Sequence, residues 1–195
     1  DTKDMAAAGM DFFSMFGSFP HYRNPYWRKD GSFGMEYQDS HIDKLLSWAP
    51  KASVLPRVFY TAPDWWSAAN QSERHVYAPG RKGMQVRESF ASLKCRKELS
   101  PYYRRAVRHL IDRYGDHLMG IHVASGPCGE HFSWDVWGHE PSSAWGDLSE
   151  PMRQAFVRYL RRKYGNDVGR LREAFKDPKA DFRFFGGDLM SEVGG

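Results

Sequence analysis

Long apolar runs are absent from this sequence of 195 residues. A helix that crosses a membrane needs about 20 consecutive apolar residues, and no stretch approaches that length. The start of the chain also lacks a basic segment followed by an apolar one, which would mark a secretory signal. The sequence therefore predicts no membrane contact and leaves the cellular compartment open.

Cysteine is equally scarce, because the chain has two, Cys95 and Cys128. Two thiols could form one bridge, but they do not make a disulfide framework. We expect two free thiols, with a single disulfide as the alternative.

No internal repeat, low-complexity segment or linker rich in proline, glycine and serine divides the chain. We expect residues 1–195 to form one domain or part of one, with an ill-defined tail over 176–195. The chain begins at Asp1 without a methionine and ends in Val-Gly-Gly, as a piece of a longer product would.

The formal net charge is +4, which raises the question of a nucleic-acid partner. The basic residues gather in segments such as Arg104–Arg108 and Arg161–Lys163, where they alternate with apolar residues at helical spacing. No RNA- or DNA-binding motif accompanies them. We therefore expect solvated helix faces and no nucleic-acid partner.

Hydrophobic periodicity and turn residues divide the chain into alternating strands and helices. Strands are expected over 10–16, 54–61 and 117–124. Helices are expected over 4–8, 39–49, 101–114, 150–164 and 167–175, with Ser100 and Ser149 as N-caps. Loops are expected over 17–38, 62–99 and 125–148.

This order predicts βαβ units and a parallel sheet. The loops after the strands are long and the turns before them short, as in a (β/α)8 TIM barrel, where the long loops build the active-site face. A doubly wound sheet shares this asymmetry, but no glycine-rich phosphate loop follows the first strand, because Gly17–Pro20 does not fit one. The fold class expected is α/β, in the form of a partial TIM barrel.

The three long loops are rich in aromatic and polar side chains. Flat indole rings beside carboxylates and imidazoles suit a sugar, whose faces stack and whose hydroxyls form hydrogen bonds. A small core beneath the loops is the alternative explanation. The candidate substrate-binding residues are His21, Tyr22, Trp27, Asp64, Trp65, Trp66, His131, Trp134 and Trp137.

Glu130 is the candidate catalytic group. A buried strand runs into the turn-forming residues Ser125–Gly129 and delivers this single carboxyl among aromatic rings. Such surroundings raise the pKa of an acid, as protonation of a glycosidic oxygen near neutral pH requires. The alternatives are a glutamate that caps a turn or pairs with an arginine.

Four stretches of the chain resemble clan A glycoside hydrolases, and most closely the β-galactosidase-like proteins of and around family 42. The stretches are Leu55–Trp66, Tyr103–Asp116, Gly120–Glu130 and Phe156–Gly165, and the resemblance covers about residues 9–175. It implies a TIM barrel of which this chain holds strands two to four with their helices, and a carbohydrate substrate with no cofactor.

The resemblance also implies roles for the two carboxylates of a retaining mechanism. Glu130 stands where the clan has its acid/base at the end of strand four, although Gly129 replaces the asparagine that usually precedes it. The nucleophile, at the end of strand seven, falls outside this chain. We therefore expect the chain to be inactive alone, and the sugar to be a β-galactoside on the resemblance only.

Two other functions remain open. A carbohydrate-binding barrel without hydrolytic activity would have the same aromatic loops. A metal site could use Cys128, His131 and His139, but the spacing lacks the remaining ligands of a zinc site.

Overall fold

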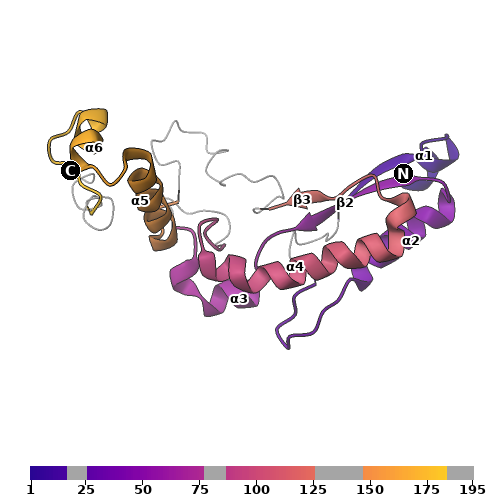
Figure 1. Cartoon of the computed structure of the whole chain (residues 1–195). Coiled ribbons are helices and arrows are strands. Elements are labelled where there is room, and N and C mark those ends of the chain that lie inside the picture. Colours follow the sequence, from indigo (N-terminus) through magenta and orange to yellow (C-terminus); the bar gives the residue numbers. More distant parts are fainter. Residues whose placement is uncertain (17–25, 77–86, 126–146, 184–195) are drawn as a thin grey trace.

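The computed structural model describes residues 1–16, 26–76, 87–125 and 147–183. Helices and strands alternate along the chain, as the sequence predicts (Figure 1). In order they are α1 (Thr2–Ala7), β1 (Phe12–Phe16), α2 (Glu36–Trp48), β2 (Ser53–Phe59), α3 (Asp64–Ala69), the 3₁₀ helix η1 (Gln71–Glu73), α4 (Leu93–Tyr114), the 3₁₀ helix η2 (Gly115–His117), β3 (His122–Ala124), α5 (Glu150–Tyr164) and α6 (Val168–Phe175).

The three described strands form one parallel sheet in the order β1-β2-β3. Phe16 of β1 and His122 of β3 flank Arg57 of β2, so these three positions share one face of the sheet. Parallel neighbours joined through α2 and α4 are βαβ units. The predicted parallel α/β arrangement is therefore confirmed for this part of the chain.

Helices α2 and α4 cover one face of the sheet (Figure 1). Val58 of β2 packs in one cluster with Ile42 of α2 and Leu99 and Leu110 of α4, all of them buried. Burial alternates along β2, since Val54, Pro56 and Val58 are buried and the residues between them are half-exposed. A strand with period-two burial presents one face to the helices and the other away from them.

Helix α4 begins earlier than the sequence predicts. Ser92, not Ser100, is the N-cap, and its hydroxyl accepts the Cys95 amide at 2.9 Å. Pro101 lies inside the helix, where it removes one backbone hydrogen bond. Burial of Cys95 and Leu99 favours the additional helical turns. Further along α4, Ala106, Leu110 and Tyr114 are buried at helical spacing.

Three further predictions about element bounds were wrong. The stretch 62–99 is not a continuous loop, because it contains α3, η1 and the first turns of α4. The strand predicted over 117–124 is shorter, because its first part is η2 and a single bridge from Leu118 to Val54. The predicted helix over 39–49 begins at Glu36 instead.

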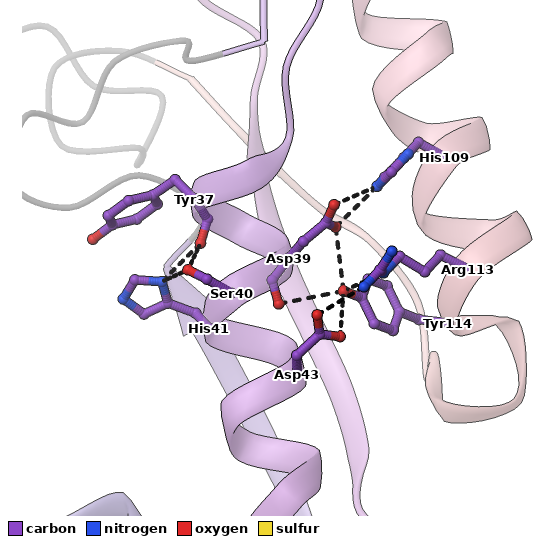
Figure 2. A network of polar contacts seen from close by, with 8 residues as sticks. All are labelled: Tyr37, Asp39, Ser40, His41, Asp43, His109, Arg113 and Tyr114. Atoms are coloured by element: carbon purple, nitrogen blue, oxygen red, sulfur yellow. Dashed lines mark hydrogen bonds and ion pairs between the residues drawn. The ribbon is translucent and has the colours of Figure 1, made fainter.

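Polar contacts fix α2 against α4 (Figure 2). Asp39 on α2 contacts His109 on α4, with both carboxylate oxygens 2.9 Å from Nε2. The Tyr114 hydroxyl donates to Asp43 at 2.8 Å and Arg113 pairs with the same carboxylate at 2.8 Å. Because these residues recur one helical turn apart on each helix, the contacts form a ladder that joins α2 to α4.

Helices α5 and α6 lie at the end of the molecule farthest from α1 (Figure 1). They have a small core of their own, made by Leu160, Leu171, Ala180 and Phe182. The predicted start of α5 is confirmed, since Ser149 caps it, and Gly165 ends it in a left-handed conformation. Among the described residues, no helix has the length and apolar character needed to cross a bilayer.

Candidate functional site

The carboxyl edge of the sheet is the place where the ends of β2 and β3 are joined. The amide of Tyr60, one residue beyond β2, donates at 2.6 Å to the carbonyl of Ala124, the last residue of β3. Ser125, which is buried, donates its hydroxyl to the Tyr60 carbonyl at 3.0 Å. In α/β proteins with parallel strands, ligands bind at this carboxyl edge. The carboxyl edge of the sheet is therefore the candidate ligand site.

Ala62 is held by two side chains where the chain turns from β2 into α3. The Glu88 carboxyl accepts the Ala62 amide at 2.8 Å, and the Arg87 guanidinium donates to the Ala62 carbonyl at 3.5 Å. The same Arg87 nitrogen lies 3.6 Å from the carboxylate of Asp64, the first residue of α3. Arg87 and Glu88 thus contact the amide and the carbonyl of Ala62, and Arg87 also pairs with the Asp64 carboxylate.

Glu88 is an acid enclosed in protein, with 8% of its surface exposed. Burial raises the pKa of its carboxyl to about 7, although the Ala62 amide and Arg87 both favour the ionised form. Its second oxygen, Oε2, is buried without a hydrogen-bond partner in the part of the chain that the structure describes. A buried acid in these conditions keeps its proton into the neutral range.

Short extended segments place Arg87 and Glu88 at this edge. Residues 73–75 and 87–89 run antiparallel, with the His75 amide on the Arg87 carbonyl at 2.7 Å and the Ser89 amide on the Glu73 carbonyl at 2.8 Å. Next to them, the Leu148 amide donates to the Val76 carbonyl at 2.8 Å. These pairings join the segment after α3 to the segment before α5.

The four described residues of the predicted substrate-binding set lie together at this end of the sheet. Trp66 is 1% exposed, donates to Glu98 at 2.6 Å and belongs to the main core. Trp27 is also buried and stacks on Tyr102 with ring centroids 5.1 Å apart. Both rings are enclosed, so we assign Trp66 and Trp27 to the core. For these two residues the alternative explanation holds, in which aromatic residues form a small core beneath the loops.

Trp65 and Asp64 remain open to solvent in part. Trp65 is half-buried with its ring edge against Trp27 at 5.2 Å, and its indole nitrogen donates to the Trp27 carbonyl at 3.4 Å. The side chain of Asp64 is 47% exposed. Trp65 and Trp66 lie in helix α3 and not in a loop as predicted. Of the four described members of the predicted set, Asp64 and Trp65 are the accessible ones.

The rest of the predicted set lies outside the described residues. This applies to the catalytic candidate Glu130 and to His21, Tyr22, His131, Trp134 and Trp137. It applies also to the metal-site candidates Cys128 and His139, so their predicted roles stay predictions. Cys95 is a buried free thiol on α4. Within the described residues, no cluster of three or more histidine, cysteine or acidic side chains could hold a metal.

Arg87 and Glu88 are residues that the sequence reasoning missed. They fall in a stretch predicted as a polar loop, where charged residues are expected in water. One signal was present, because the run Val86-Arg87-Glu88-Ser89-Phe90 has no glycine, proline, asparagine or aspartate and precedes the N-cap Ser92. Their importance depends on pairing with 73–75, which no local pattern shows.

Comparisons with known proteins identify the fold. No family model matches the chain, and no curated protein does. Among solved structures, it is similar to a polyextremophilic β-galactosidase from the Antarctic haloarchaeon Halorubrum lacusprofundi, with TM-score 0.60 and 22% identity over 90% of this chain and 24% of the other. A cold-adapted β-galactosidase from Rahnella sp. R3 gives TM-score 0.59 and 16% identity over 98% of this chain and 25% of the other.

At these identities the likeness shows the fold and not the activity. The chain spans about a quarter of the length of each β-galactosidase. Its parallel sheet with α2 and α4 therefore has the fold of one part of a β-galactosidase.

Proposed function

We propose that this chain forms one part of the TIM barrel of a retaining glycoside hydrolase that acts on O-glycosidic bonds, with β-galactosides as the substrate class. Glu130 is the acid/base, and the nucleophile lies on residues that this chain does not include. The supporting observation is the fold shared with two β-galactosidases, of which the chain spans about a quarter.

The path of the chain at the carboxyl edge supports the role of Glu130. Ser125 is bonded to that edge through the Tyr60 carbonyl. Glu130 follows five residues later, so covalent geometry keeps it within roughly 18 Å of Ser125. Asp64, at the start of α3, comes from the same edge. This bound is compatible with Glu130 and Asp64 belonging to one site.

The chemistry requires two carboxyls. Glu130 protonates the departing glycosidic oxygen while a second carboxylate attacks the anomeric carbon and forms a glycosyl-enzyme intermediate. Glu130 then removes a proton from water, which attacks the anomeric carbon, releases the sugar and restores both groups. In this scheme the 195-residue chain by itself binds sugar and does not turn it over.

The decisive experiment uses the full-length protein that contains this chain, with Glu130→Gln and Glu130→Ala variants. Both variants should lose far more activity on a disaccharide than on an aryl galactoside, because an activated phenol leaves without protonation. Azide should rescue Glu130→Ala on the aryl galactoside by replacing the deprotonated water. Parental rates on the disaccharide in Glu130→Gln would show that Glu130 is not the acid.

A non-catalytic sugar-binding barrel is the second candidate, and Gly129 before Glu130 favours it, because a substrate-binding asparagine is missing there. The two candidates separate cleanly. Binding of galactosides without turnover by the full-length protein supports the binding module, whereas turnover that depends on Glu130 supports the hydrolase.

A further inference from the structure

The Arg87-Glu88 pair occupies an unusual position for charged residues. Both side chains are more than nine-tenths buried, at 6% and 8% exposure, in a segment predicted as loop. Charged side chains are rarely buried to this degree without a specific task. Both side chains contact the backbone of Ala62, which lies two residues before the helix that carries Asp64 and Trp65.

The two side chains act on opposite peptide groups of Ala62. The Glu88 Oε1 accepts the amide at 2.8 Å, while the Arg87 guanidinium lies 3.5 Å from the carbonyl. That guanidinium also lies 3.6 Å from Asp64. Because Ala62 is 0% exposed, water does not replace these bonds when they break. The clamp therefore lies where the chain passes from β2 into α3.

We propose that Arg87 and Glu88 are positioning residues, which clamp Ala62 and thereby hold Asp64 and Trp65 at the carboxyl edge, and that loss of the Glu88 proton draws Arg87 away from Asp64 and the Ala62 carbonyl and so weakens sugar binding. The part that concerns sugar rests on the function proposed above. The part that concerns Ala62 and Glu88 does not.

The surroundings of Glu88 explain the direction of the effect. Burial and Asp64 on α3 raise the pKa of Glu88, whereas the Ala62 amide, the backbone amide of Glu88 itself and Arg87 lower it. Glu88 in turn raises the pKa of Cys95 on α4 and of Tyr26 before α2, so these two groups also face it. Arg74 is its antiparallel bridge partner.

Ionisation leaves Oε2 charged with no hydrogen-bond donor among the described residues. Arg87 is the adjacent cation, so it is drawn toward Glu88 and away from Asp64 and the Ala62 carbonyl. With its pKa raised to about 7, Glu88 makes this change within the neutral range.

The first test follows the Ala62 amide directly. In the ¹⁵N-alanine-labelled 195-residue chain, the Ala62 resonance should shift with a midpoint near pH 7. Glu88→Gln keeps the acceptor and the shape but cannot ionise, so it should abolish this shift. Glu173→Gln, which removes an exposed carboxyl on α6, is the matched control and should retain it. Persistence of the shift in Glu88→Gln would overturn the assignment.

The second test measures affinity for methyl β-galactoside by calorimetry at pH 6 and pH 8.5, in the full-length protein that contains this chain. The parental protein should bind at least about fivefold more weakly at pH 8.5, a usual size for coupling between two sites, whereas Glu88→Gln should bind equally at both values. Arg87→Lys retains the positive charge but loses the planar guanidinium, which donates to two groups at once. It should therefore bind the sugar more weakly than the parental protein at pH 6.

The outcomes of the two tests separate the proposals. An Ala62 shift near pH 7 without sugar binding at any pH would support the clamp and contradict the proposed function. Sugar binding with an Ala62 amide that stays constant from pH 5.5 to 8.5 would support the function and overturn the clamp. An equal pH effect on affinity in Glu88→Gln and the parental protein would also overturn it.

Discussion

Replacing Glu88 with glutamine should make the stability of the protein less dependent on pH. Burial raises the pKa of this carboxyl from its ordinary value of 4.5 to about 7. Between these values the folded chain holds a proton that the unfolded chain has released. Stability contributed by the neutral acid is therefore fully present below pH 4.5 and is lost as the pH rises toward 7.

The size of the effect follows from the two pKa values. The difference between 4.5 and about 7, at about 1.4 kcal/mol per pKa unit, gives about 3 kcal/mol of unfolding free energy. That is a large fraction of the total for one domain. Glutamine has nearly the same shape, retains the acceptor for the Ala62 amide, and does not titrate. The variant should match the parental chain near pH 4.5 and exceed its stability at pH 8.

Urea unfolding followed by circular dichroism at pH 4.5 and pH 8 measures this difference. The comparison uses parental minus variant values at each pH, so titration elsewhere in the molecule cancels. Glu173→Gln, an exposed glutamate on α6, is the matched control for the loss of one negative charge. An identical difference between Glu88→Gln and the parental chain at both pH values would refute the reasoning.

Three other substitutions test the fold by urea unfolding. Leu110→Ala removes a side chain with 0% exposure and should cost about 2–5 kcal/mol of unfolding free energy. Its control, Ile111→Ala, removes a side chain with 45% exposure and should cost under about 1 kcal/mol. Equal losses of stability in the two variants would contradict the packing of α4. Ser92→Ala removes the N-cap bond to the Cys95 amide and should cost about 1–2 kcal/mol of unfolding free energy. Ser100→Ala changes the N-cap that the sequence predicts instead. If only Ser100→Ala is destabilising, α4 begins where the sequence predicts. Asp39→Ala breaks the contacts with His109 and Tyr114 and should cost about 1–3 kcal/mol of unfolding free energy. Asp112→Ala, at an exposed position of α4, is the control. Equal stability of the two variants would show that the ladder does not stabilise the α2–α4 contact.

The fold could be predicted from the sequence where local signals decide it. Ser149 and Gly165 mark the ends of α5, and the structure uses both. The alternation of strands and helices gives the parallel sheet, because parallel strands need a crossover between them. Local signals misled where tertiary burial outweighs them. The Ser100-Pro101 pair has the form of a helix start, yet burial of Cys95 and Leu99 carries α4 back to Leu93.

The candidate site could be predicted less completely, and for a related reason. Asp64 and Trp65 follow directly after a predicted strand, so sequence order brings them to the carboxyl edge. Trp66 is adjacent to them in the sequence, but its side chain enters the core and meets Glu98. Which of two neighbouring indoles is buried depends on the direction in which α3 leaves the sheet. The turn from β2 into α3 is contacted by Arg87 and Glu88, more than 20 residues away along the chain.

The same contacts determine how a ligand could be recognised at this edge. The amide and carbonyl of Tyr60 are taken by Ala124 and Ser125, and those of Ala62 by Glu88 and Arg87. These backbone groups are satisfied inside the protein, so selectivity here has to come from side chains. Of the described ones, Asp64 offers a half-exposed carboxylate and Trp65 part of an indole. One carboxylate and one ring satisfy only some of the hydroxyls of a sugar, and Asp64→Asn should therefore weaken binding without abolishing it.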